Sequence, residues 1–352
     1  MSETHKVQFE PVGIEIEVDE DETVLEGAFR QGVMLMHGCK EGQCSSCKSF
    51  LLEGEEGLEL EMDRYSTFAL SDMEKDEGYV LLCRAHAYED ITVELINYDE
   101  DMLRSGVPIQ SARTRVEAID PVTADMRRLV LNLVEPKELA FLAGQYVDIS
   151  VPGAEVTRSF SMANTPASDE RLEFIIKVYP GGRFSGLLDA GLQVGDELTV
   201  KGPYGVFTLR ESHESDIVFI GGGAGMAPIL SLLRSMDDRG IKRNATYYYG
   251  ARTKADLCYL EELGSLEQRL EGFRFVPALS EPDDGDGWSG ETGLITDIVD
   301  RLEDDLSGRD AYVCGPPPMV EAAIALLEQH GVPTEHIFWD KFTTSADADS
   351  DE

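Results

Sequence analysis

The N-terminal part of the chain alternates hydrophobic and polar residues in a pattern that predicts strands around one short helix. Hydrophobic residues recur at every second position on both sides of a Pro–Gly turn within 7–18, which predicts a β-hairpin. Thr23 stands three residues before Glu26, the spacing of a capping box at a helix start. A last alternating run at 91–96 precedes the break SGVP. We therefore expect a first domain over residues 1–107.

The next segment contains short alternating runs separated by Gly and Pro. The runs lie at 115–119, 129–134, 146–151, 172–178 and 198–201. Many short strands at close spacing are typical of an antiparallel β-barrel. A helical pattern at 185–192 interrupts them. We predict an antiparallel barrel domain over residues 108–211.

From residue 216 onward the pattern changes. Continuous apolar runs alternate with helical patterns such as 229–239 and 320–329. This alternation predicts strands and helices in turn, as in a parallel α/β domain. We expect this domain over 212–343, followed by an acidic disordered tail at 344–352. The predicted fold class is a multidomain α+β and α/β chain.

The charge and composition of the chain exclude several classes of protein. The 352 residues carry a net charge of −38, which excludes a basic face for nucleic acid or anionic lipid. No run approaches the roughly 20 apolar residues of a membrane span, and the first nine residues show no signal-peptide pattern. We expect a cytoplasmic protein without membrane or nucleic-acid partners. Cytosolic thiols stay reduced, so the six cysteines indicate metal or redox chemistry.

Four of the cysteines have the spacing of an iron–sulfur site. Cys39, Cys44, Cys47 and Cys83 are separated by four, two and 35 residues, which is the plant-type spacing for a 2Fe–2S cluster. A tetrathiolate zinc site is the alternative, but zinc sites usually consist of two close cysteine pairs. Residues 1–107 resemble plant-type ferredoxins, which implies a β-grasp fold.

Two motifs in the barrel segment resemble the flavin domain of the ferredoxin–NADP reductase superfamily. They are RSFS at 158–161 and PGGRFS at 180–185. The resemblance implies that Arg158 pairs with the FAD diphosphate, Phe160 packs near the flavin and Ser161 bonds toward its N5 edge. The full set implied to bind FAD is Arg158, Ser159, Phe160, Ser161, Gly181, Gly182, Phe184 and Ser185. Independently, two glycines before a helix expose backbone donors to phosphate, although each motif alone also fits a barrel corner.

The segment IVFIGGGAGMAPIL at 217–230 reads as strand, glycine loop and helix. Met226 occupies the third glycine position counted from Gly221, so the plain dinucleotide fingerprint is not met. The segment matches the GGGxGxAP pattern of the same superfamily, and CGPPPM at 314–319 matches a later motif. The resemblance implies a nicotinamide site formed by Gly222, Gly223, Gly225, Met226, Arg252, Cys314, Gly315 and Pro316. Cys314 would lie against the nicotinamide, whereas an isolated cysteine at a strand end is more often a small buried hydrophobe.

The end of the third segment, FWDKF at 338–342, occupies the place where family members carry an aromatic ring over the flavin. Phe342 is the candidate for this ring, and with Cys314 and Ser161 it completes the predicted catalytic set. Arg252 could contact the 2′-phosphate of NADPH. We expect NADH, because the sequence YGAR resembles the NADH-using oxygenase reductases.

The order of the three segments resembles the reductase components of bacterial multicomponent oxygenases over nearly the whole chain. Within them, MHGCKEGQCSSCKS and DEGYVLLCRAHA resemble the reductases of soluble diiron monooxygenases of methane, propane and related short alkanes. Hydride carries two electrons and the cluster accepts one, so FAD must convert between them. The resemblance implies an NADH-dependent, monomeric reductase that passes single electrons to the hydroxylase component of a diiron monooxygenase, of the propane type.

Two alternatives remain at this point. A reductase of a Rieske aromatic-ring dioxygenase has the same order of domains, and a non-enzymatic metal-binding interaction protein could use the glycine loops as turns. Residues 1–107 hold 26 acidic and eight basic residues, a net charge of −18. This charge could steer the ferredoxin domain onto a basic hydroxylase surface, or it could serve solubility.

Overall fold

A computed structural model of the chain describes residues 3–53, 60–99, 102–103, 106–154, 156–167, 170–283, 285 and 287–342. The described residues form two compact units. One contains residues up to Ile109 together with Tyr204–Val206, and the other contains Gln110–Pro203 and the residues from Phe207 onward. The predicted disordered tail at 344–352 lies outside the described residues. No helix in the described part is long and apolar enough to cross a membrane.

The first unit is built on a five-stranded sheet of order β2-β1-β7-β3-β5. Its strands are β1 (Thr4–Glu10), β2 (Ile14–Asp19), β3 (Lys48–Glu53), β5 (Tyr79–Leu81) and β7 (Ile91–Leu95). A second sheet pairs β4 (Glu61–Met62) with β6 (Ala85–His86), and the helices are α1 (Val24–Arg30) and α2 (Asp72–Asp76). β1 pairs antiparallel with β2 and parallel with β7. This is the expected β-grasp arrangement.

Local signals in this unit act as predicted. β1 and β2 form the hairpin, and the capping box of Thr23 and Glu26 begins α1. The Thr23 hydroxyl accepts the Glu26 N–H, and the Glu26 carboxylate accepts the Thr23 N–H, so two otherwise unpaired donors at the helix start are satisfied. Leu25, Ala28 and Phe29 of α1 are buried. The short helix is therefore held by both its cap and its apolar face.

The second unit begins with an antiparallel six-stranded sheet of order β11-β10-β13-β8-β9-β12. Its strands are β8 (Gln110–Pro121), β9 (Met126–Glu135), β10 (Tyr146–Val151), β11 (Val156–Ser161), β12 (Arg171–Lys177) and β13 (Glu197–Tyr204). A bridge between Met162 and Phe174 joins the two edges of the sheet, so the sheet curls into the predicted barrel. Helix α4 (Arg183–Ala190) begins two residues before the predicted 185, because Gly182 is its N-cap.

The rest of this unit is a parallel sheet of order β17-β16-β15-β14-β18-β19. Its strands are β14 (Asp216–Gly222), β15 (Ala245–Ala251), β16 (Phe273–Leu279), β17 (Glu291–Thr292), β18 (Arg309–Gly315) and β19 (Ile337–Lys341). Its helices are α5 (Met226–Arg239), α6 (Leu260–Arg269), α7 (Ile295–Leu302) and α8 (Pro317–Gln329), with short 3₁₀ turns η1 (Gly223–Gly225), η2 (Lys254–Asp256) and η3 (Thr334–His336). The predicted parallel α/β domain is confirmed.

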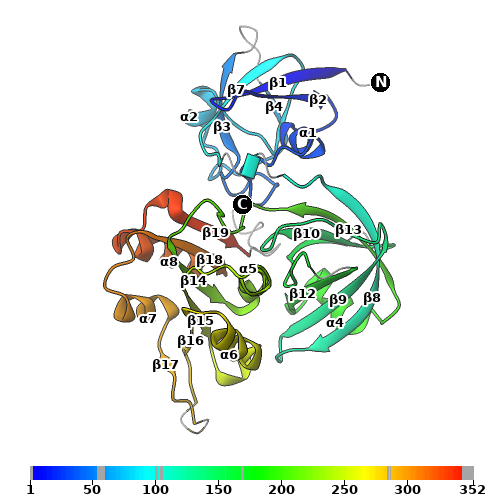
Figure 1. Cartoon of the computed structure of the whole chain (residues 1–352). Helices are drawn as coiled ribbons and strands as arrows, with labels where there is room; N and C mark the ends of the chain where they lie inside the picture. Colours follow the sequence, from blue (N-terminus) through cyan, green and yellow to red (C-terminus); the bar gives the residue numbers. More distant parts are fainter. Residues whose placement is uncertain are drawn as a thin grey trace. The chain divides into compact units, whose positions relative to one another are not determined.

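Alternate residues of each central strand serve opposite faces of this sheet. In β14, Ile217 and Phe219 join the core formed with α5 and α6, whereas Val218 and Ile220 join the core formed with α7 and α8. Figure 1 shows these helix pairs on the two sides of the sheet. A strand that is buried on both faces needs hydrophobic residues at consecutive positions. This is why the sequence shows continuous apolar runs here and alternation in the barrel.

The direction of the strand order reverses between β14 and β18. From β14 the chain steps outward through β15, β16 and β17, and then returns to β18 on the other side of β14. In open parallel sheets the crevice at the carboxyl ends of such a pair is the usual ligand site. The glycine loop after β14 and the CGPPPM segment after β18 both lie at this reversal.

Helix α5 connects the barrel to the parallel sheet. The Ser231 hydroxyl is buried, donates to the carbonyl of Asn164 at 2.6 Å and accepts the N–H of Gly144 at 3.3 Å. Both of these partners belong to the barrel segment. Helix α5 thus links the barrel and the parallel sheet of the second unit through hydrogen bonds.

A half-buried arginine on the same helix adds to this connection. Arg234 donates to the carbonyl of Ala163 at 2.8 Å and pairs with Glu262 of α6 at 2.7 Å and Glu173 of β12 at 3.1 Å. Burial alone would raise the pKa of Glu173, but the positive charges of Arg234 and Arg128 outweigh burial, so the pKa lies below its usual range. The carboxylate therefore stays charged and paired.

Replacing Ser231 with alanine should destabilise the second unit. The change leaves a buried carbonyl and a buried N–H without a partner, at a cost of about 1–3 kcal/mol in the free energy of unfolding. Chemical denaturation followed by circular dichroism measures the loss. Ser265→Ala is the matched control, because Ser265 accepts a hydrogen bond from Arg269 at an exposed position of α6. Equal stability of the two variants would contradict this account of α5.

Candidate functional site

The four predicted cluster ligands lie together in the first unit. The thiols of Cys39 and Cys44 are hydrogen-bonded, and this contact lowers the pKa of Cys44 to about 5 and raises that of Cys39. A corresponding hydrogen bond with Cys47 raises the pKa of Cys83, and Cys83 also senses the charge of Cys44. The thiolate is the metal-binding form of cysteine. Four thiol groups within one another's reach match the ligand set of a 2Fe–2S cluster.

Backbone N–H groups surround these sulfurs. Those of Gln43 and Glu41 donate to Cys39 Sγ at 3.1 and 3.4 Å, and that of Cys39 lies 3.3 Å from Cys44 Sγ. Hydrogen bonds to cluster sulfurs are one way in which a protein sets the reduction potential. The loop therefore offers both ligands and donors.

The shape of this loop depends on residues in the left-handed backbone region. Gly42 has φ +72°, and a Cβ there would lie 2.6 Å from the Cβ of Tyr65. Ser45 also has a positive φ, of 59°, and its hydroxyl donates to the carbonyl of Ala69 at 3.0 Å. A positive φ is strained for any residue with a Cβ, and at Ser45 the side-chain hydrogen bond helps to hold this conformation. This hydrogen bond joins the loop to the segment around Ala69.

The predicted flavin residues on β11 divide between the two faces of that strand. Arg158 and Phe160 share one face, and Ser159 and Ser161 share the other, because side chains alternate along a strand. Phe160 contacts the ring of Phe184 in α4, with centroids 4.7 Å apart. Ser159 donates to Asp148 at 2.6 Å, and Ser161 is buried at the end of the strand.

The glycine turn before α4 forms the second part of the flavin site. Gly181 has φ +76° with open space around it, and Gly182 is the N-cap of α4. The Ser185 hydroxyl accepts the N–H of Tyr179 at 2.9 Å, which holds the turn against the helix. A hollow of about 500 Å³ lies over the turn, lined by residues 178–183 and 185–187 among others. The helix start and the hollow together could accept a phosphate group.

The nicotinamide residues meet at the reversal of the parallel sheet. A Cβ on Gly225 would lie 2.2 Å from the carbonyl oxygen of Cys314, and one on Gly222 would lie 2.7 Å from the sulfur of Met319. The chain segments at the ends of β14 and β18 thus lie so close together that Gly225 cannot be replaced by a residue with a Cβ unless the backbone moves. Gly223, by contrast, has φ +56° and open space around it.

Two residues of the predicted nicotinamide set have buried side chains. Met226 is fully buried in the core beside Cys258, so only its backbone could face a cofactor. Cys314 is also fully buried, and burial raises the pKa of its thiol well above the usual range. Cys314 is therefore a neutral, small hydrophobic group here.

Phe342 lies next to the end of β18. Its N–H donates to the carbonyl of Gly315 at 2.9 Å, and its half-buried ring packs against the core of the second unit. Pro316 is the N-cap of α8. The structure thus brings the predicted aromatic residue to the same end of the parallel sheet as the glycine loop and Cys314.

Sequence reasoning missed two carboxylates near Arg252. The guanidinium lies 3.8 Å from Asp125 and 4.0 Å from Asp256, and the Arg252 side chain is 62% exposed. Asp256 closes a capping box with Thr253. The sequence T-x-x-D could have indicated Asp256, whereas Asp125 comes from the barrel and only the fold brings it near.

Comparison with known proteins agrees with this geometry. Residues 7–88 match the 2Fe–2S iron–sulfur cluster binding domain, 113–209 the oxidoreductase FAD-binding domain and 219–324 the oxidoreductase NAD-binding domain. The chain is 55% identical to the propane 2-monooxygenase reductase component of Gordonia sp. (strain TY-5), over 98% of this chain and 99% of that protein. The chain belongs to the reductase components of multicomponent oxygenases.

Two further proteins are similar at lower identity. The reductase is 37% identical to the phenol 2-monooxygenase reductase component DmpP of Pseudomonas sp. (strain CF600), over 98% of this chain and 96% of that protein. The crystal structure of the Amycolatopsis cytochrome P450 reductase GcoB is similar with a TM-score of 0.85 and 33% identity, over 97% and 100% of the two chains. The expected fold class and the three cofactors are confirmed, and the protein is an NADH-dependent flavin and iron–sulfur oxidoreductase.

Replacing Cys83 with alanine should remove the cluster and leave the flavin. Alanine offers no ligand atom to the cluster iron, so the iron content of the purified reductase should fall close to zero. Iron and sulfide analysis measures the loss, and reduction of FAD by NADH should persist. Cys258→Ala is the control, since Cys258 is buried in the second unit beside Tyr249. Retention of the cluster in Cys83→Ala would exclude Cys83 as a ligand.

Proposed function

We propose that this reductase oxidises NADH and delivers single electrons to the hydroxylase component of a diiron monooxygenase of the propane type. The observation that carries the proposal is the identity of more than half of the residues with a propane 2-monooxygenase reductase component over nearly the full length of both chains. Matches to all three cofactor domains favour the enzyme over a non-enzymatic interaction protein. When bound, FAD supplies the exchange between a two-electron donor and a one-electron acceptor.

We assign residues 1–107 to the cluster domain, 108–211 to the FAD domain and 212–343 to the nicotinamide domain. Cys39, Cys44, Cys47 and Cys83 would hold the cluster. Arg158, Phe160, Ser161 and the turn at 181–185 would hold FAD, and the loop at 222–226 with 314–316 would hold NADH. The contacts within each group support the assignment, since Phe160 of β11 meets Phe184 of α4, and the glycine loop after β14 meets Cys314 of β18.

In this proposal Cys314 shapes the nicotinamide site and does not act as an acid or base. Its thiol is buried and neutral, so it would shape the floor of the nicotinamide crevice rather than transfer a proton. Phe342 would close the crevice from the adjacent strand end, since its backbone is bonded to Gly315. Ser161 offers a hydroxyl at the end of β11 on the barrel side.

The surroundings of Arg252 favour NADH over NADPH. A 2′-phosphate would need an unbalanced positive charge near the end of β15. Arg252 instead faces the carboxylates of Asp125 and Asp256, which balance its charge and would repel a phosphate. This supports the nicotinamide preference that the sequence predicts.

The first unit carries a surface suited to a protein partner. Phe68 is 80% exposed and Met73 is 68% exposed, although both are large and apolar. Phe68 adjoins Ala69, whose carbonyl accepts the hydroxyl of Ser45 in the cysteine loop. Acidic residues including Asp72 and Asp76 lie beside Met73. An apolar patch near the cluster with acidic surroundings fits docking onto a basic hydroxylase surface.

We keep the cytoplasm and the monomeric state as predictions. The structure describes all six cysteines and pairs none of them in a disulfide, as is typical of a reducing compartment. Size-exclusion chromatography with light scattering measures the oligomeric state.

Anaerobic titration with NADH tests the enzymatic part of the proposal. The holoenzyme should accept one electron more than its FAD alone can hold, with flavin and iron–sulfur absorption bleaching together, because the cluster is the one-electron acceptor. NADPH at equal concentration should reduce FAD far more slowly. Bleaching of the flavin alone would contradict the role of the four cysteines.

Electron delivery to the purified hydroxylase should slow as ionic strength rises. Attraction between the acidic first unit and a basic partner is screened within about 10 Å at 0.1 M salt. Stopped-flow measurement of hydroxylase reduction gives the rate, and reduction of FAD by NADH serves as the salt-insensitive reference. A flat salt profile would contradict steering, and transfer to a Rieske oxygenase instead of the diiron hydroxylase would assign a different partner.

A further inference from the structure

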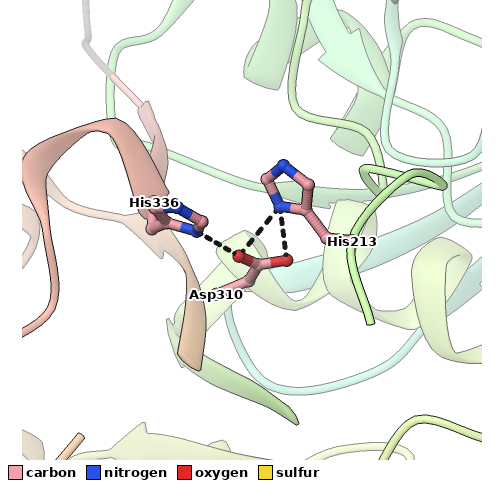
Figure 2. Close-up of side chains that lie close together, drawn as sticks. All are labelled: His213, Asp310 and His336. Carbon is pink, nitrogen blue, oxygen red and sulfur yellow. Dashed lines mark hydrogen bonds and ion pairs between the residues drawn. The ribbon is translucent and has the colours of Figure 1, made fainter. Parts of the chain in front are cut away.

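A group of three ionisable side chains lies in the second unit, apart from the predicted cofactor residues. His213 precedes β14, Asp310 is the second residue of β18, and His336 ends η3. Figure 2 shows both imidazoles turned toward the Asp310 carboxylate. His213 Nδ1 lies 3.0 Å from Asp310 Oδ2, and His336 Nδ1 lies 2.7 Å from Asp310 Oδ1. Three segments far apart in the sequence thus converge on one point.

The geometry of the group is compatible with a metal ion. One ligand atom from each residue lies within 4.8 Å of the others. Two imidazole nitrogens and a carboxylate oxygen form a donor set that Zn²⁺ binds, with a water as the fourth ligand. Asp310 is fully buried, whereas the side chains of His213 and His336 are 29% and 32% exposed. Solvent therefore reaches the two imidazoles but not the carboxylate.

A fourth residue, Arg243, also contacts the Asp310 carboxylate. Arg243 donates to Asp310 Oδ2 at 2.5 Å, and its Nε donates to the carbonyl of Ser215 at 2.6 Å. Metal-binding carboxylates commonly have such an outer hydrogen-bond partner, which sets their orientation. Oδ1 lies on the side of the imidazoles, 2.7 Å from His336 Nδ1 and 3.1 Å from His213 Nδ1.

The same contacts also describe a group without an ion, in which each Nδ1–H donates to Asp310. An ion would replace these two protons, and the positive charge of Arg243 would weaken its binding. The geometry favours the ion in one respect. Both histidines direct Nδ1 toward one buried carboxylate and their ring centroids lie 4.9 Å apart, so three ligand atoms lie within reach of one another.

We propose that His213, Asp310 and His336 form a binding site for a divalent transition-metal ion of the Zn²⁺ type. The ion joins the segment before β14 to η3 and thereby to β19, the strand that leads to Phe342. Its expected effect is to stabilise the second unit, since a ligand that binds only the folded state raises the unfolding temperature. The proposal does not depend on the identity of the electron acceptor.

Zinc titration of the holoenzyme tests the site. The reductase is loaded with cluster and FAD, so that the four ligand cysteines are occupied, and is titrated with ZnCl₂ by isothermal calorimetry. We expect one ion per chain and a rise in the unfolding temperature of the second unit. Zinc-edge X-ray absorption should show nitrogen and oxygen ligands at about 2.0–2.1 Å.

The decisive variant is His213→Gln with His336→Gln. Glutamine keeps an N–H donor for Asp310 but is a poor zinc ligand, so the affinity should fall by about 100-fold or more while FAD and cluster are retained. His330→Gln is the matched control, because His330 faces a single carboxylate, that of Asp300, at 2.9 Å. The control should bind zinc like the wild type.

Three results would overturn the proposal. They are equal zinc affinity in the wild type and the double variant, sulfur ligands at about 2.3 Å, which would mean binding to thiols, or no binding at about 100 μM zinc. If the double variant loses FAD, the zinc affinity of the single variant His336→Gln is measured instead, because this change removes one partly exposed ligand. Unchanged zinc affinity in that variant would equally refute the site.

Discussion

The close approach of the loops after β14 and β18 determines the arrangement of the second unit. A Cβ on Gly225 would stand 2.2 Å from the carbonyl oxygen of Cys314, and one on Gly222 would stand 2.7 Å from the sulfur of Met319. Glycine at both positions allows the ends of β14 and β18 to lie this close together, with the start of α5 beside them. The backbone hydrogen bond from Phe342 to Gly315 brings a third segment to the same end of the sheet. This packing brings together the residues that we propose to hold NADH.

Helix α5 extends the same constraint to the barrel. Its first residues lie at the crevice, and its middle binds the barrel through the Ser231 hydroxyl and the Arg234 guanidinium. A charged pair that is largely removed from water is costly to break when one partner is lost. The strand with Arg158 and the loop with Gly225 therefore belong to one compact body. Such rigidity suits hydride transfer, which needs two cofactors in a fixed geometry.

The first unit meets a different requirement, because its cluster must be both sheltered and accessible to a partner protein. Cys47 and Cys83 are buried, whereas Cys39 and Cys44 are partly exposed. Phe68 and Met73 remain on the surface nearby, within a segment of high negative charge. Large exposed apolar side chains often mark the surface that a partner protein covers. Acidic neighbours keep the free protein soluble. Exposed apolar side chains and a high negative charge thus occur together in the first unit.

The sequence by itself determined the three folds and indicated the four clustered cysteines and the glycine loops, because these signals act over short distances along the chain. Strand periodicity, the capping box of Thr23 and the cysteine spacing each depend on near neighbours. Only the tertiary structure decided that Cys314 is buried, that Asp125 reaches Arg252, and that His213 meets Asp310 from 97 residues away. Such contacts follow from the order of strands in a sheet and from packing between domains, which no local pattern encodes.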